Sequence, residues 1–223
     1  MVTTVYLIRH AEAMGNICGF FQGHTDCEVS SKGKMQLELL SERFKDIKFD
    51  MIFSSPLKRT IETAEAVNLY HKLPINMEKG LIEINGGVFE GMDWGEIPLK
   101  YPEEYDSWQN HPEKFSVKDG DSMEDVYNRI TLTVTRLAAR NRFKTLALIS
   151  HGCAIKNFLC YANEIPLKDI NSLEWSDNTA VTKIEFNENL KPTIIFQNDI
   201  SHLSDDMQTL SKQTWWRNEV PVR

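Results

Sequence analysis

Two short apolar runs that lie far apart in the chain both end in a histidine. The first is VYLIRH, at residues 5–10, and the second is LALISHG, at residues 146–152. Neither run alternates polar and apolar residues, which is typical of strands that are covered on both faces. The carboxyl ends of parallel strands meet at one edge of a sheet, where ligands bind. If the two strands pair, His10 and His151 become neighbours at that edge.

Strand and helix signals alternate along the rest of the chain. The patterns predict strands at 3–8, 49–55, 74–77, 145–150, 179–186 and 192–198, and helices at 31–46, 56–71, 122–142 and 152–162. This alternation predicts an α/β class, with a three-layer α/β/α sandwich around a mainly parallel, mixed central sheet. The helix at 31–46 is predicted to bury Met35, Leu39, Leu40, Phe44 and Ile47.

The stretch at about 80–121 mixes glycine, proline and aromatic residues without a sustained period. It predicts a loop-rich insertion, with one or two helices near 96–109, that caps the site. The whole chain, 1–223, is therefore expected to form one domain with this cap-like insertion. The tail at 204–223 shows no clear period.

Composition and charge exclude several classes of protein. The net charge of −7 argues against a nucleic-acid partner, which would need a basic face. No stretch approaches the roughly 18 apolar residues of a membrane span, and the N-terminus lacks the features of a signal peptide. The four cysteines form no C-x-x-C pair, so a reduced, cytoplasmic protein is expected. The oligomeric state stays open, with a homodimer as one assembly to consider.

Arginine beside histidine at a strand end suits phosphoryl chemistry. Arginine offers planar, bidentate donors to phosphoryl oxygens, and a nearby cation favours the neutral imidazole that a nucleophile needs. A lone histidine at a strand end is more often structural, and paired histidines also bind metals. Because the adjacent cations disfavour a metal, no metal or organic cofactor is expected. Cys153, beside His151, could be a thiol nucleophile, but a small buried hydrophobe is the simpler interpretation.

Six segments, from LIRHAEAMGN at residues 7–16 to ISHGCAI at residues 149–155, together resemble the motifs of the histidine phosphatase superfamily, the phosphoglycerate-mutase-like proteins. LIRHAEAMGN looks like the family signature R-H-G-E-x-x-x-N, with Ala11 where the family has glycine. The other segments that resemble family motifs, in family order, are QGHTDCEVSSKGKMQ, SSPLKRTIETAEAV, LIEINGGVFEG, DGDSMEDVYNR and ISHGCAI. Together they cover about residues 2–200, which makes the resemblance highly specific.

The resemblance implies a role for each matching residue. His10 would be the nucleophile that forms a phosphohistidine, and Glu83 the proton donor to the leaving oxygen, with Glu90 as a nearby rival acid. The phosphoryl group would be held by Arg9, Arg59 and His151. The residues expected to bind phosphate or substrate are Asn16, Gln22, Gly23 and Gly152.

Family members are phosphatases or cofactor-primed mutases. The stretch between Glu83 and His151 is shorter than in the glycolytic mutases, and its candidate cations, Lys100, Lys114 and Lys118, are few. These features favour a metal-independent phosphomonoesterase acting on a small phosphorylated metabolite. The alternatives are a primed phosphoglycerate mutase, and a catalytically silent member that binds phosphorylated ligands.

Overall fold

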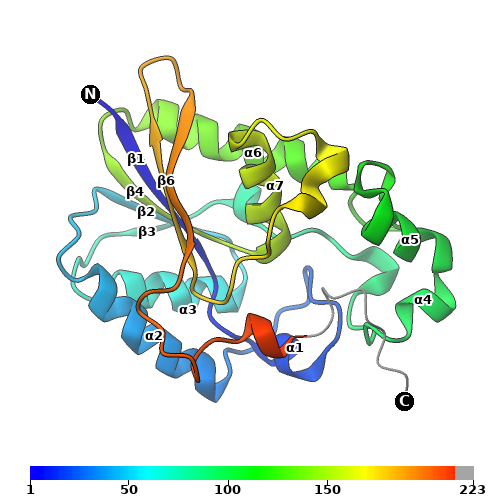
Figure 1. The fold of residues 1–223 in the computed structure, drawn as a ribbon. Coiled ribbons are helices and arrows are strands. Elements are labelled where there is room, and N and C mark those ends of the chain that lie inside the picture. Colours follow the sequence, from blue (N-terminus) through cyan, green and yellow to red (C-terminus); the bar gives the residue numbers. More distant parts are fainter. Residues whose placement is uncertain (214–223) are drawn as a thin grey trace.

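A six-stranded sheet forms the centre of the molecule (Figure 1). The computed structural model describes residues 1–213. The strands are β1 (Thr3–Arg9), β2 (Met51–Ser54), β3 (Ile75–Met77), β4 (Thr145–Ser150), β5 (Val181–Phe186) and β6 (Pro192–Asp199). Their order is β3-β2-β4-β1-β5-β6; the first four are parallel, β5 runs antiparallel to β1, and β6 runs antiparallel to β5. This confirms the predicted mixed, mainly parallel sheet, including the pairing of β1 with β4.

Helices cover both faces of the sheet. The helices α2 (Ser31–Phe44) and α3 (Lys58–Val67) lie on one face, and α6 (Met123–Arg140) and α7 (Gly152–Ala162) lie on the other (Figure 1). Alternate residues of β1 point to the two sides. Tyr6 and Ile8 belong to the hydrophobic core with α2 and α3, whereas Val5 and Leu7 belong to the core with α6 and α7. The predicted three layers are therefore confirmed.

The buried face of α2 differs from the prediction. Met35 and Leu39 are 43% and 36% exposed. The buried positions of α2 instead include Gly33, Gln36 and Ser41, which an apolar pattern does not detect. Gln36 is buried because its Oε1 accepts a hydrogen bond from the backbone N–H of Glu12.

Side-chain caps mark the starts of two helices. The Ser30 side chain accepts from the backbone N–H of Gly33 at the start of α2, and Ser122 and Asp125 form a capping box at α6. The short helix α1 (Met14–Cys18), which directly follows the first histidine, has no counterpart among the predicted helices. Its five residues are too few to show a period.

The insertion extends to one end of the sandwich, beyond the carboxyl ends of the strands (Figure 1). It contains α4 (Ile97–Lys100) and α5 (Pro102–Asn110), near the predicted range. Its side chains Phe89, Trp108 and Phe115 pack into the core shared with α6 and α7. In the tail, a short 3₁₀ helix forms at Leu210–Lys212, and residues 214–223 lie outside the described part of the chain. Within residues 1–213, no helix has the length and apolar character needed to cross a membrane.

Candidate active site

The pairing of β1 with β4 brings the two histidines together. Arg9 lies opposite Ser150 in the parallel register, and the backbone N–H of His10 donates to the Ser150 carbonyl at 3.0 Å. The ring centroids of His10 and His151 are 5.2 Å apart. The two strand ends therefore meet as the sequence predicts.

A small pocket of about 50 Å³ opens at this edge of the sheet. Six of the predicted site residues line it: Arg9, His10, Asn16, Gln22, Glu83 and Gly152. The predicted Arg59 and His151 are fully buried behind them. Gly23 does not line the pocket, and its carbonyl instead accepts a hydrogen bond from Arg59 at 2.7 Å. Trp94, Trp108 and Trp175 complete much of the wall.

The hydrogen bond that His10 makes through Nδ1 leaves a lone pair on its other ring nitrogen, Nε2. His10 Nδ1 lies 2.7 Å from the carbonyl oxygen of Ala11. A carbonyl can only accept, so Nδ1 carries the proton and Nε2 does not. Burial lowers the pKa of His10 well below its ordinary value, and the positive charges of Arg59 and Arg9 lower it further. His10 is thus a neutral imidazole with a lone pair on Nε2.

Four buried nitrogen atoms of residues at this site have no hydrogen-bond partner within residues 1–213. They are Arg9 Nε, Arg59 Nε, His151 Nδ1 and the Gln22 side-chain amide nitrogen. Buried donors are almost always paired, so a cluster of unpaired ones points to a ligand that accepts hydrogen bonds. Two guanidinium groups next to an imidazole suit a tetrahedral oxyanion such as a phosphoryl group.

Backbone carbonyls hold both arginines in place. Arg9 Nη1 donates to the Ser176 carbonyl at 2.5 Å, and Arg59 Nη1 donates to the Thr25 carbonyl at 2.9 Å. Burial lowers the pKa of Arg59 to about 10, which leaves the guanidinium charged at neutral pH. The site therefore keeps two fixed positive charges beside a neutral histidine.

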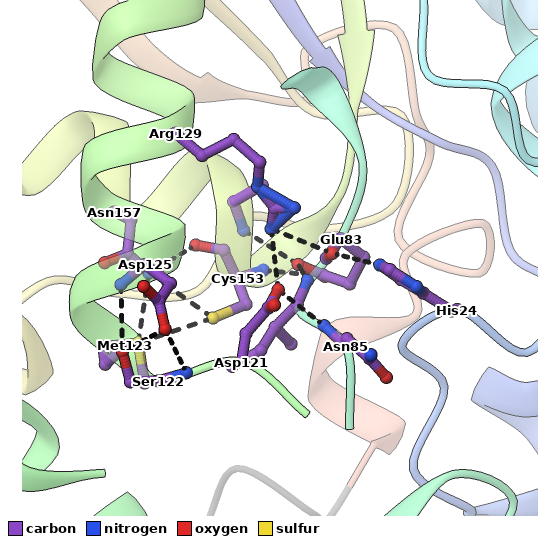
Figure 2. Close-up of polar contacts among 12 residues, drawn as sticks. His24, Glu83, Asn85, Asp121, Ser122, Met123, Asp125, Arg129, Cys153 and Asn157 are labelled. Carbon is purple, nitrogen blue, oxygen red and sulfur yellow. Dashed lines mark hydrogen bonds and ion pairs between the residues drawn. The ribbon is translucent and has the colours of Figure 1, made fainter. Parts of the chain in front are cut away.

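Hydrogen bonds hold the Glu83 side chain at the start of α7 (Figure 2). Its carboxylate accepts hydrogen bonds from the backbone N–H groups of Cys153 at 3.0 Å and Ala154 at 2.9 Å, and from that of Ile84 at 2.9 Å. Its carbonyl accepts from Arg129 Nη2 at 3.1 Å and from His24 Nε2 at 3.0 Å. These contacts fix a carboxylate in the wall of the pocket.

The rival acid, Glu90, has a different position. Its carboxylate accepts hydrogen bonds from the backbone N–H groups of His24 at 2.7 Å, Thr25 at 2.9 Å and Gly86 at 2.8 Å. Glu90 does not line the pocket. Its hydrogen bonds to His24 and Thr25 hold the loop whose Thr25 carbonyl accepts from Arg59, so Glu90 acts on Arg59 only through that loop. Of these two acids, Glu83 alone reaches the pocket.

Three further residues act on this site without having been predicted. Ser55 Oγ lies 2.7 Å from His151 Nε2. Ser55 follows β2, the strand next to β4, so the strand-end argument could have found it. Arg129 ends the segment DGDSMEDVYNR, so the family motif that this segment resembles was a signal for it, whereas Trp175 lies in none of the six segments.

Cys153 lines the pocket but does not offer a thiolate. Burial raises the pKa of its thiol well above the ordinary value, and the nearby charge of Glu83 adds to the effect. A protonated thiol is a weak nucleophile, which agrees with the structural interpretation of this cysteine.

Comparisons with known proteins agree with this geometry. The family model described as histidine phosphatase superfamily (branch 1) matches residues 5–199. Phosphoserine phosphatase 1 of Hydrogenobacter thermophilus is 32% identical over 202 residues, which are 89% of this chain and 93% of that protein.

Solved structures share the fold over nearly the whole chain. Bacillus stearothermophilus YhfR superposes with a TM-score of 0.87 at 28% identity, covering 91% of this chain and 100% of that one. A histidine-to-alanine mutant of phosphoserine phosphatase from Entamoeba histolytica, in complex with phosphoserine, superposes with a TM-score of 0.81 at 27% identity, with the same coverage.

Proposed function

This chain belongs to the histidine phosphatase superfamily, branch 1, and from that premise we propose that it is a metal-independent phosphomonoester phosphatase. The proposed substrate is a small phosphorylated metabolite, and the proposed intermediate is a phosphohistidine on His10. The observation that carries the proposal is the ring of unpaired buried donors around a neutral His10. Those donors fit the oxygens of a transferring phosphoryl group.

In the first proposed step, His10 Nε2 attacks phosphorus and the bond from phosphorus to the ester oxygen breaks. Glu83, protonated for this step, gives its proton to the leaving oxygen, and the alcohol departs. Arg9 and Arg59 stabilise the negative charge on the phosphoryl oxygens. His151 donates from Nδ1, with the Ser55 hydroxyl donating to its Nε2.

In the second proposed step, water attacks the phosphohistidine. Glu83, now a carboxylate, takes a proton from the water, and the bond from phosphorus to Nε2 breaks. Inorganic phosphate leaves, and both His10 and Glu83 return to their starting protonation states. The cycle uses only groups of this chain and water.

The names of two relatives favour hydrolysis over phosphoryl transfer to a second substrate. The protein from Hydrogenobacter and the one from Entamoeba are both named phosphoserine phosphatases. A mutase remains the second candidate, since the same phosphohistidine serves both reactions.

The proposal predicts phosphate release that survives a chelator. A panel of phosphomonoesters, including phosphoserine and 3-phosphoglycerate, is incubated with the protein in the presence and absence of EDTA. Equal release in both conditions is the expected result. Release that disappears with EDTA and returns with a divalent metal would contradict metal independence, and activity only after priming with a bisphosphoglycerate would favour the mutase.

The pH dependence follows from the state of His10. Burial and the two arginines lower its pKa well below 6.5, so the nucleophile stays neutral through the mildly acidic range. We therefore expect kcat/KM for an aryl phosphate to hold its value on going from pH 7 to below 6.5, with any loss due to His10 appearing only at lower pH. A steady-state pH profile measures this. A fall centred on pH 6.5 or above would show an unperturbed histidine and contradict the assignment.

A further inference from the structure

A second cavity, of about 590 Å³, adjoins the catalytic pocket. Its volume is within the range of small-molecule sites, roughly 300–1,000 Å³. Trp108 and Trp175 line both spaces, so the two are neighbours. The catalytic pocket, at about 50 Å³, is far smaller than this range and suits a small group such as a phosphoryl group rather than a whole ester. The remainder of a substrate must lie outside it.

A buried lysine, Lys156, lines the large cavity. Its ammonium lies 4.4 Å from the centroid of the Trp175 ring and donates to Asn171 Oδ1 at 3.0 Å. An ammonium has three donors, so this single hydrogen bond leaves capacity for a ligand. A buried cation costs free energy unless it is paired, and the mechanism above makes no use of Lys156.

Two further donors in the same wall lack acceptors. The side-chain nitrogens of Gln109 and Asn198 are buried and have no hydrogen-bond partner among residues 1–213. Two acids also line the cavity, but Glu174 is exposed to water and the Asp177 carboxylate already accepts from Thr209. The cavity therefore presents one cation and two amide donors that could meet an anionic group.

The position of Lys156 relative to the catalytic centre follows from the helix. Lys156 is four residues after Gly152 on α7, about one turn, or roughly 6 Å along the axis. A Cβ on Gly152 would lie 3.4 Å from Arg9 Nε and 3.6 Å from the Trp175 ring. The Trp175 ring thus lies close both to the Gly152 end of the catalytic pocket and to the Lys156 ammonium.

We propose that this cavity is the leaving-group subsite and that Lys156 binds an anionic group, such as a carboxylate, on the alcohol part of the substrate. The inference rests on the proposed function and narrows its substrate class to phosphorylated acids. Lys156 is then a specificity-determining residue, and the amides of Gln109 and Asn198 contribute hydrogen bonds to the same group.

Matched substrate pairs test this subsite. Each pair differs only in having a carboxylate in place of a hydroxymethyl group: 3-phosphoglycerate against glycerol 3-phosphate, and 6-phosphogluconate against sorbitol 6-phosphate. The wild-type protein should prefer the acid in at least one pair. Lys156→Met should lower the acid-to-polyol ratio of kcat/KM by about tenfold or more, mainly through KM, because it removes a charged hydrogen bond. Lys156→Arg should keep most of the preference.

The pH dependence supplies an independent readout. Burial lowers the pKa of Lys156 to about 8, so the preference for acids should fall as the pH rises through that value. The other titratable groups facing Lys156 are Cys153, Cys160, Asp177 and Glu174. Burial raises the pKa of the Cys153 thiol well above its ordinary value and that of Cys160 to about 11, so neither thiol accounts for a change near pH 8. The Lys156→Arg variant should retain the preference at higher pH.

Controls separate the possible failures. Lys168→Met removes an exposed lysine nearby and should leave the ratio unchanged, and thermal unfolding of each variant shows whether it is folded. Binding of the same acids to the His10→Ala protein, measured by calorimetry with and without Lys156→Met, requires no turnover. An unchanged ratio in Lys156→Met, or an equal loss for acid and polyol, would overturn the subsite. If the acids bind in a Lys156-dependent way but the wild-type protein hydrolyses none of them, the proposed hydrolysis would be overturned and the subsite would stand.

Discussion

Replacing His10 with alanine is expected to lower kcat by about 10⁴-fold or more, because the reaction then lacks its nucleophile. The residual phosphoryl-binding groups can orient a substrate but cannot form the covalent intermediate. Steady-state phosphate release measures the loss. His111→Ala removes an exposed imidazole in the insertion and is the matched control, with near wild-type activity expected.

The same variant tests the intermediate. A radiolabelled substrate, quenched in alkali after milliseconds, should leave label on the wild-type protein and none on His10→Ala. A variant that kept more than a few per cent of wild-type turnover would show that another group attacks phosphorus. The phosphohistidine mechanism would then be wrong even if the protein is a phosphatase.

Replacing Glu83 with glutamine is expected to lower kcat by about 10²–10⁴-fold for alkyl phosphates and far less for p-nitrophenyl phosphate. An alkoxide is a poor leaving group and needs the proton, whereas p-nitrophenolate leaves without it. The measurement is the ratio of the two losses in one variant. Equal losses for both esters would contradict a role in leaving-group protonation.

The Glu83→Gln variant also has a structural cost. Glutamine keeps only one acceptor oxygen for the three backbone N–H groups that the carboxylate now serves. We expect a loss of about 1–3 kcal/mol in the free energy of unfolding, visible as a lower melting temperature. Glu38→Gln, at an exposed position of α2, is the matched control and should change neither activity nor stability.

Much of the fold is predictable from the sequence because burial on both faces leaves a clear signal. The apolar runs that became β1 and β4 have no alternation, and the stripe of Met123, Val126 and Ile130 marks the buried face of α6. The buried face of α2 could not be predicted in the same way. Gln36 lies in it because a distant backbone N–H pairs with its amide, and no local pattern contains that information.

The residues of the site also differ in how far the sequence predicts them. His10 and His151 could be predicted because each directly follows a strand, and strand ends in parallel sheets converge. Lys156 could not, because a single lysine in an apolar helix usually lies at the surface. Its burial depends on Trp175 and Asn171, which a different part of the chain supplies.

The anchoring of Glu83 has a consequence for how such a protein can diversify. Its hydrogen bonds come from α6, α7, the adjacent Ile84 and the loop at His24, and none comes from α4 or α5. The acid is thus tied to the same framework that carries the nucleophile. A change in the backbone path of α4 and α5 would therefore break none of these hydrogen bonds, although Ile97 and Trp108 of this segment also belong to the core. The proposed selectivity residue, Lys156, lies on α7, the helix whose backbone N–H groups hold Glu83, so selectivity would change through single side chains on a framework that keeps the acid and the nucleophile in place.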